Sequence, residues 1–304
     1  MDTDALDRIE RTLGERPVRL APLRGGCIAE VMRADLASGE RLAVKLDRGD
    51  SARLDVEGRM LDRLRGVVPT PGVIASAPDV LVLAYIGHDG RRSEAGEREA
   101  GELLARLHGI ASERFGLDED GLIGPLDQAN RWEVSWGRFY IERRVGPMAR
   151  ACVSRGVLSP ACARAFEDVL GDRGGALAQR LDASRARPGL IHGDVWSGNV
   201  LWDRGRVAAL IDPAPYFADP EIELAFIDLF GCFGPAFGEA YRALRPAPAG
   251  ETRADNAWRR DAHQLYPLLV HARLFDSPRR GGGSRGGGYG ASVEATLRRV
   301  TDGI

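Results

Sequence analysis

The segment "LIHGDVWSGNVLW", from Leu190 to Trp202, places a His, an Asp and an Asn between two apolar runs. Apolar runs of this length are typical of buried strands, and the polar residues between them are typical of a turn. Asn199 follows Asp194 by five positions, and Asp212 comes directly after the next apolar run, Val207–Ile211. This order and spacing match the catalytic loop and the metal-binding segment of kinases.

Phosphoryl transfer explains why these residue types would occur together. The reaction needs a group that accepts the proton of the attacking hydroxyl, and Asp194 is the candidate base. Mg²⁺ prefers oxygen ligands, which the side chains of Asn199 and Asp212 can supply. His192 is expected to hold the loop through backbone hydrogen bonds, since the reaction already has its proton acceptor. Trp196, beside the base, is either a wall of the acceptor pocket or a core residue.

Lys45 is the only lysine in a chain that otherwise uses arginine. Because lysine carries a compact charge where arginine carries a planar fork, a single lysine suggests a site whose geometry rejects the fork. It ends the segment Leu23–Asp47, whose pattern predicts a strand, a Gly-rich loop, a strand, a turn and a strand. Without a Cβ, Gly25 and Gly26 would let backbone N–H groups approach phosphate oxygens.

The segments that follow complete the pattern of a small nucleotide-binding lobe. Residues 51–66 have helical spacing, and Glu57 on this helix is placed to pair with Lys45 and hold it toward the phosphates. "VLVLAYIG", Val80 to Gly87, is a continuous apolar strand that stops at a Gly-containing hinge. The backbone of this strand's end could hydrogen-bond adenine. ATP and Mg²⁺ are therefore the expected cofactors.

From Glu94 onward the composition is helical, with helices expected over Trp132–Val145 and Ala161–Leu181 among others. The sequence thus predicts an α+β, two-lobed, protein-kinase-like chain. The β-rich N lobe would comprise residues 1–87 and the larger helical C lobe residues 88–304. His271, on an apolar helix, is expected to be a core residue.

Composition excludes several other classes of protein. A net charge of −2 gives no reason to bind nucleic acid or an anionic membrane, and no apolar run approaches the length of a membrane span. The first residues do not form an export signal, so the cytoplasm is the expected location. The Gly/Arg-rich stretch Arg279–Gly290 is expected to be a flexible loop rather than an RNA-binding segment.

The four cysteines show no paired spacing and are interpreted as reduced thiols. Cys27 lies in the Gly-rich loop, where two alternatives are open. It could react with oxidants or link two chains in a redox-dependent dimer, or it could be a small buried side chain.

Three stretches make the resemblance to a family specific. "HGDVWSGNV", "IDPAPYFADPEIELAFIDLFGCFGPAF" and the segment from Leu107 to Met148 resemble the fructosamine kinase/ketosamine-3-kinase family over nearly the whole chain. Aminoglycoside phosphotransferases and choline kinases share the His-Gly-Asp and the later Asp, but lack the Trp-Ser-Gly and the Asp-Pro-Ala. The resemblance implies ATP-dependent phosphorylation of the sugar 3-hydroxyl of ketosamines on amines or protein lysines. That phosphate makes the adduct unstable, which associates the family with deglycation repair.

The resemblance also implies roles for individual residues. Those that match the family's functional positions are the catalytic Asp194, the metal-holding Asn199 and Asp212, the pair Lys45 and Glu57, and the adenine hinge Ala84, Tyr85 and Ile86. Ala84 replaces a commoner acidic residue, so only backbone contacts are implied at the hinge. Pro215, Ala218 and Pro220 depart from the family's pattern and leave the acceptor side open.

Two alternatives to a ketosamine kinase are kept. One is a kinase for an aminoglycoside or another small hydroxyl compound. The other is an inactive pseudokinase or binding module, which the presence of Lys45, Asp194, Asn199 and Asp212 disfavours.

Overall fold

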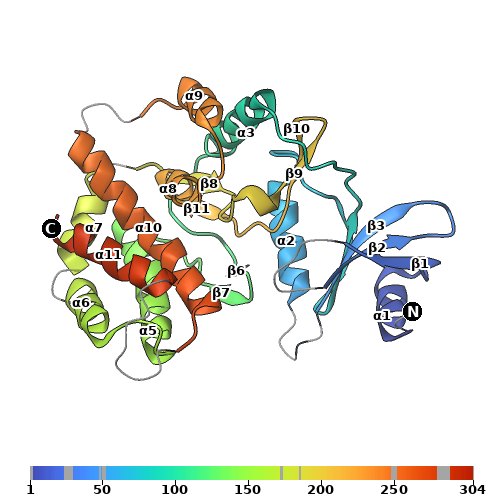
Figure 1. Ribbon diagram of the computed structural model, residues 1–304, viewed down its shortest axis with the longest axis horizontal. Coiled ribbons are helices and arrows are strands. Elements are labelled where there is room, and N and C mark those ends of the chain that lie inside the picture. Colours follow the sequence, from blue (N-terminus) through green and yellow to red (C-terminus); the bar gives the residue numbers. More distant parts are fainter. Residues whose placement is uncertain are drawn as a thin grey trace.

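The computed structural model describes residues 3–23, 30–47, 49, 53–171, 174–184, 186–247, 252–278 and 288–303. Figure 1 shows an elongated molecule with a β-rich N-terminal part at one end and a helical C-terminal part at the other. The predicted α+β, two-lobed architecture is therefore confirmed. Within the described ranges, no helix has the length and apolar character needed to cross a membrane.

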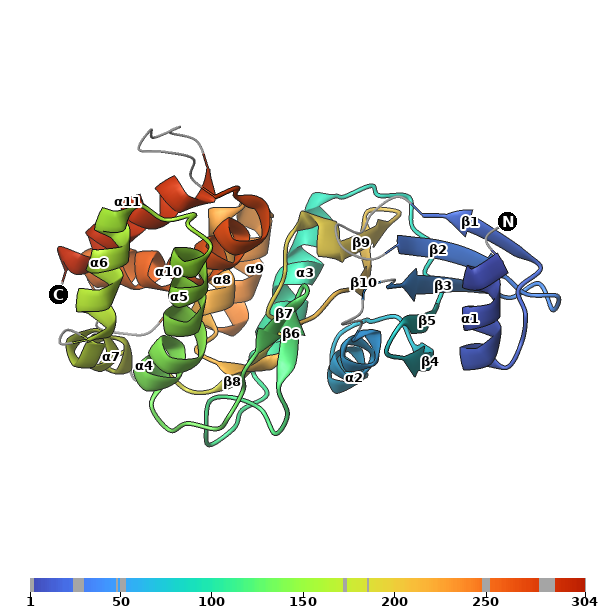
Figure 2. The ribbon, with the colours of Figure 1, turned by 90° about the horizontal axis from the view of Figure 1, so that it is seen from below.

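The N lobe is a five-stranded antiparallel sheet with a helix on each face (Figure 2). Its strands, in the spatial order β1-β2-β3-β5-β4, are β1 Arg19–Pro22, β2 Glu30–Asp35, β3 Arg41–Leu46, β4 Val73–Ala77 and β5 Val80–Ala84. Val80 and Val82 pack with Ile9 of α1 (Thr3–Leu13). Leu81 and Leu83 pack with helix α2 (Leu54–Leu64). Since successive side chains point to opposite faces, β5 must be apolar throughout, as its sequence is.

The chain crosses between the lobes after β5 and enters helix α3 (Glu94–Leu107). The crossing segment is tied to the C lobe, because the N–H groups of Asp89 and Gly90 both donate to the carbonyl of Trp202, at 3.0 and 2.9 Å. We propose that the lobes divide at the predicted position, after Gly87.

The C lobe consists of helices around three short antiparallel ribbons, β6–β7, β8–β11 and β9–β10. Its elements after α3 are β6 Gly121–Ile123, β7 Leu126–Gln128, α4 Trp136–Phe139, a π-helix Tyr140–Val145, α5 Gly146–Ser154, α6 Pro160–Leu170, α7 Gly174–Asp182, β8 Gly189–Ile191, a 3₁₀ turn Ser197–Asn199, β9 Val200–Asp203, β10 Arg206–Leu210, β11 Tyr216–Ala218, α8 Glu221–Leu229, α9 Pro235–Leu244, α10 Arg253–Phe275 and α11 Tyr289–Thr301.

Two predicted helices differ from the observed ones. Ala161–Leu181 is two helices, because α6 ends at Gly171. The helix predicted over Trp132–Val145 begins only at Trp136, where the hydroxyl of Ser135 caps it, and it continues through the π-helix into α5. The Gly/Arg-rich loop falls on residues 279–287, which lie outside the described residues, and on the start of α11.

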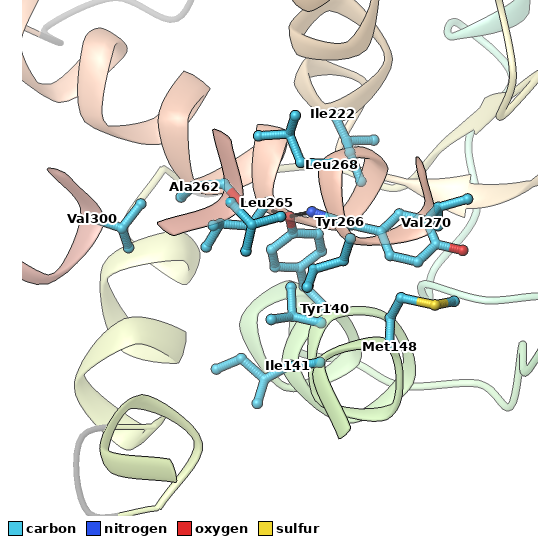
Figure 3. Packing of buried hydrophobic residues seen from close by; sticks show 14 of the residues in the cluster. Tyr140, Ile141, Met148, Ile222, Ala262, Leu265, Tyr266, Leu268, Val270 and Val300 are labelled. Carbon is cyan, nitrogen blue, oxygen red and sulfur yellow. Dashed lines mark hydrogen bonds between the residues drawn. The ribbon is translucent and has the colours of Figure 1, made fainter. Parts of the chain in front are cut away.

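Helix α10 runs through the centre of the C lobe although it contains Pro267. Proline has no N–H, so the carbonyl four residues earlier, that of His263, loses its helical partner. The Tyr140 hydroxyl lies 3.1 Å from this carbonyl, donates to the carbonyl of Ala262 at 2.7 Å and accepts from the N–H of Tyr266 at 3.2 Å. Figure 3 shows the ring against the helix. The hydroxyl thereby compensates for the interrupted backbone.

The same helix buries His263 completely, and its Nε2 accepts the indole N–H of Trp136 at 3.0 Å. Burial, together with the smaller effect of the positive charge of Arg259, lowers the pKa of His263 to about 3. In the unfolded chain this histidine takes up a proton near pH 6.5, whereas the buried His263 of the folded chain stays neutral. The stability that the neutral histidine contributes is therefore fully present above pH 6.5 and is lost as the pH falls toward 3.

We expect His263→Gln, whose carbonyl can still accept from Trp136, to reduce this acid sensitivity. Between pH 7 and pH 5 the histidine alone should cost the wild type about 2 kcal/mol in free energy of unfolding. Urea unfolding at pH 7 and at pH 5 gives the loss in free energy of unfolding for each protein. The loss should be smaller in the variant than in the wild type by about 2 kcal/mol. Equal losses in the two proteins would contradict the assignment of a neutral, buried His263.

Candidate active site

The Lys45 ammonium lies between two carboxylates that come from different lobes. Its Nζ is 2.6 Å from Oε1 of Glu57 on α2 and also hydrogen-bonds Oδ1 of Asp212, which follows β10. Burial lowers the pKa of Lys45, but the charges of Glu57 and Asp212 outweigh it, so the pKa is raised. The lysine therefore stays charged. The structure thus brings together three of the residues that the sequence singled out.

Asp212 adopts a backbone conformation that non-glycine residues rarely occupy, with φ at +55°. The neighbouring backbone holds this conformation. Ile211 N–H donates to the carbonyl of Asn199 at 3.0 Å, and Ala214 N–H donates to the carbonyl of His192 at 2.8 Å. Strained backbone conformations are common at functional sites, where the surrounding contacts are strong enough to hold them. Here it directs the carboxylate toward Lys45.

The carboxylate of Asp194 is held by Asn199, whose amide nitrogen donates to Oδ2 and to the carbonyl of Asp194, both at 2.9 Å. Burial and, to a smaller extent, the negative charge of Asp212 outweigh the Asn199 hydrogen bond and raise the pKa of Asp194 to about 7. A carboxylate that takes up a proton near neutral pH suits a general base.

The donor atoms fit a magnesium ion. With its nitrogen on Asp194, Asn199 has its amide oxygen available as a ligand, and the Asp212 carboxylate supplies further oxygens. The part of the chain that the structure describes contains no group of three His, Cys, Asp or Glu side chains arranged for a metal ion. Mg²⁺ is suited to such a site, since it commonly takes one or two protein oxygens and completes its shell with phosphate and water.

A buried carboxylate that the sequence analysis missed positions the catalytic loop. Glu223 on α8 is 2 % exposed and accepts the N–H groups of His192 at 3.2 Å and Gly193 at 2.5 Å. The Nε2–H of His108 donates to it at 2.8 Å, and Nδ1 of that ring accepts from the Tyr241 hydroxyl. Burial raises the pKa of Glu223, but the interactions with His108 outweigh it and the pKa is lowered. The only signal in the sequence was an acid inside the apolar run "EIELAF".

His192 behaves as expected, because its N–H and its carbonyl both carry loop hydrogen bonds and burial lowers the pKa of its ring. Gly193 has φ at +88°, and a Cβ at this position would lie 2.1 Å from the carbonyl oxygen of Ala214. Only glycine fits between the loop and the segment that carries Asp212.

Trp196 is 38 % exposed and is therefore not a core residue. Its ring lies over Gly198, where a Cβ would come within 2.3 Å of it. The structure therefore excludes the core interpretation, and the position of Trp196 beside the acceptor stays a prediction.

The hinge residues are placed only in part as expected. Ala84 N–H donates to the carbonyl of Gly72 at 2.8 Å, so this donor is already used. Tyr85 and Ile86 are partly buried and remain candidates, although the carbonyl of Ile86 lies 3.0 Å from Nδ1 of His88. Gly25, Gly26 and Cys27 lie outside the described residues, so the phosphate loop and the redox-linked dimer stay predictions. Cys152, Cys162 and Cys232 are buried free thiols.

Helix α2, which carries Glu57, is tied to the C lobe. Arg59 pairs with Glu119 at 3.0 Å, and Arg63 pairs with Asp118 at 2.6 Å. Between these ion pairs, Met60 packs in a small apolar cluster with Leu122 of β6. The helix therefore contacts the catalytic lobe along one side.

Comparisons with known proteins agree with this geometry. A family model described as fructosamine kinase matches residues 1–284. A ketoamine kinase of Lactiplantibacillus plantarum is 29 % identical over 281 residues, covering 92 % of this chain and 93 % of that protein. The chloroplastic protein-ribulosamine 3-kinase of Arabidopsis thaliana is 31 % identical over 219 residues, covering 69 % of this chain and 62 % of that protein.

Solved structures show the same fold. A structure from Thermobifida fusca, assigned as a fructosamine-3-kinase, superposes with a TM-score of 0.82 at 29 % identity and covers 99 % of this chain and 100 % of that chain. An aminoglycoside phosphotransferase bound to AMP-PNP and hygromycin B has a TM-score of 0.59 at 17 % identity, covering 99 % of this chain and 98 % of that chain. At that identity the likeness shows the fold alone.

We expect Glu223→Gln to impair both folding and catalysis. A carboxamide has one acceptor oxygen, so a loop N–H or the His108 N–H loses its partner in a buried site. The expected cost is about 1–3 kcal/mol in free energy of unfolding. Displacement of Asp194 should lower turnover by at least about tenfold. Urea unfolding and steady-state kinetics measure the two effects.

Glu221→Gln is the matched control, because Glu221 lies on the same helix and pairs with Arg242 nearer the surface, at 2.8 Å. It should leave turnover nearly unchanged. Equal losses of turnover in the two variants would contradict the positioning role of Glu223.

Proposed function

Because the chain belongs to the fructosamine kinase family, whose members are phosphotransferases acting on sugar hydroxyls, we propose that it transfers the γ-phosphoryl group of ATP to the 3-hydroxyl of a ketosamine. The observation that carries the proposal is the convergence of Lys45, Asp212, Asn199 and Asp194 at the contact between the lobes.

In this mechanism the N lobe holds the nucleotide. The backbone near Tyr85 and Ile86 receives adenine, and the sequence pattern assigns Gly25 and Gly26, which lie outside the described residues, to the phosphates. Lys45 binds phosphate oxygens while Glu57 holds the lysine in place. Asn199 and Asp212 would hold magnesium, which would neutralise charge on the phosphate oxygens.

Asp194 accepts the proton of the attacking hydroxyl. Its Oδ2 already accepts from Asn199, so we assign Oδ1 to the substrate. The raised pKa means that the carboxylate binds a proton readily once the hydroxyl oxygen begins to bond to phosphorus. Positioning by the loop supplies the in-line geometry, which is the larger part of catalysis in phosphoryl transfer.

Trp196 is assigned to the acceptor. Its partly exposed ring lies on the catalytic loop two residues after Asp194, where the apolar face of a sugar can pack on it. The name of the plant relative supports ribulosamines, including protein-bound ones, as substrates. Phosphorylation at the 3-hydroxyl would destabilise the adduct, so a role in deglycation is part of the proposal. The cytoplasmic location stays a prediction from the sequence.

An acceptor panel tests the proposed function. With Mg·ATP, we expect turnover with ribulosamine, erythrulosamine or fructosamine and none with aminoglycosides, and ³¹P NMR should place the phosphate on the 3-hydroxyl. Turnover with aminoglycosides alone would establish the alternative of an antibiotic-type kinase, to whose fold the chain is similar. Failure to consume ATP with any acceptor would indicate a binding module.

We expect Asp194→Asn to reduce turnover by roughly 10² or more, since a positioned general base typically supplies about 10²–10⁴. The change keeps the size of the side chain, so nucleotide affinity should remain close to that of the wild type. Stopped-time assays and nucleotide titration separate the two quantities.

Asp203→Asn is the control, because Asp203 lies on the neighbouring hairpin and its exposed carboxylate pairs with the exposed Arg204 at 3.8 Å. This variant should retain turnover. Near-normal turnover in Asp194→Asn would reject the assigned base.

A further inference from the structure

A narrow pocket opens beside Asp194, between α8 and α10. Its walls include Tyr216, Ile222, Phe226, Tyr266 and Val270, and Figure 3 shows Tyr266 and Val270 projecting from α10. The volume is about 30 Å³. That exceeds the roughly 10–15 Å³ that one water requires and falls far below the roughly 150 Å³ of a cavity that holds benzene. The volume is about that of one water molecule in the liquid, so the first carbon of an unbranched chain can enter the pocket and a ring cannot.

The inner wall of the pocket offers few polar groups to a ligand. Both oxygens of Glu223 already accept N–H groups, and the Tyr266 hydroxyl donates to Gln128 at 3.0 Å. If the polyol tail of a sugar entered the pocket, its hydroxyl groups would lose their hydrogen bonds to water without gaining partners. A hydrocarbon has no such hydrogen bonds to lose. The pocket is therefore suited to the apolar part of an acceptor.

Among the described residues that line the pocket, none offers a cation that could bind a carboxylate. His271 lines it, but Nδ1–H of this ring donates to the carbonyl of Pro267 at 2.8 Å and burial lowers the pKa of the ring, which keeps it neutral. The guanidinium of Arg144 lies against the Tyr216 ring, 3.9 Å from its centre, and bonds Asn130 and the carbonyl of Ala129 instead. With Asp194 at the opening, an anionic substituent would be repelled.

The walls are held in place before any ligand binds. The ring of Tyr216 stacks on that of Phe139 at 5.6 Å, and the Arg144 guanidinium packs against both rings. Tyr266 is fixed through Gln128, whose amide donates to the carbonyl of Ala214 at 3.2 Å. A preformed apolar pocket binds without the cost of ordering its side chains.

We propose that this pocket receives the hydrocarbon part of the amine substituent of a ketosamine acceptor. This inference rests on the proposed function, because the 3-hydroxyl must lie at Asp194. In a ketosamine only the carbonyl carbon separates the amine-bearing carbon from the carbon that carries this hydroxyl, so the substituent starts beside the pocket. Adducts of unbranched alkyl amines, including the side-chain amine of lysine, fit the pocket. Adducts of α-amino acids branch next to the nitrogen and carry a carboxylate, so they do not.

The test is kcat/KM for ribulosamines of methylamine through hexylamine. Each methylene that enters the pocket should raise kcat/KM by about fourfold until the pocket is filled, after which the values level off. For adducts of lysine derivatives, the side-chain adduct should exceed the α-amino adduct by at least about tenfold. The KM for ATP should be the same throughout.

Two variants assign the effect to the pocket. The chain length at which kcat/KM stops rising is the levelling point. Phe226→Leu enlarges the pocket and should move the levelling point to longer chains. Val270→Ile narrows the pocket and should move the levelling point to shorter chains. Phe230→Leu is the matched control, because Phe230 contacts the same His271 ring at 4.6 Å without lining the pocket. Its levelling point should stay that of the wild type.

Values of kcat/KM that do not depend on chain length would overturn the pocket assignment, as would identical shifts in Phe226→Leu and Phe230→Leu. Absence of turnover with every ribulosamine, methylamine's included, would instead reject the proposed function. The two failures are therefore distinguishable.

Discussion

The ammonium group of Lys45 is the constraint on which the arrangement of this molecule depends. One buried cation joins a strand and a helix of the N lobe to the segment after β10 in the C lobe, through Glu57 and Asp212. A buried charge without partners is costly, so the lysine requires the carboxylates, and the largely buried Glu57 requires the lysine. This dependence places the side chains that we propose to bind phosphate and metal at the same point between the lobes.

The catalytic groups themselves lie on short irregular segments that a rigid surrounding holds. Asp194 is fixed by Asn199, the loop backbone by Glu223, and Asp212 by a strained conformation that neighbouring hydrogen bonds maintain. Behind them, the large apolar cluster around α10 supplies the scaffold. The molecule combines a well-packed core, which gives stability, with a few buried polar contacts that give geometry.

The parts of the site that could be predicted from the sequence are those in which residue type and local spacing carry the information. The five residues Lys45, Glu57, Asp194, Asn199 and Asp212 each lie on or beside a recognisable strand or helix, and the structure brings them together. Glu223 and the pocket could not be predicted, because their contacts join segments far apart in the chain. The helix through Gly146 and Pro147 was missed for a different reason. Gly146 N–H bonds the carbonyl of Ile141, five residues back, so the π-helix shifts the hydrogen-bond register where proline would otherwise end the helix.

The attachment of α2 to the C lobe makes the surroundings of Lys45 sensitive to salt concentration. Arg59, Arg63 and Met60 hold one side of this helix to the segment around Glu119. On its other side, Leu54 and Leu61 pack against Leu81 and Leu83 of the sheet. Ion pairs near the surface weaken as the salt concentration rises, whereas aliphatic contacts persist. Salt should therefore loosen the helix that carries Glu57 from the C lobe before it loosens it from the sheet.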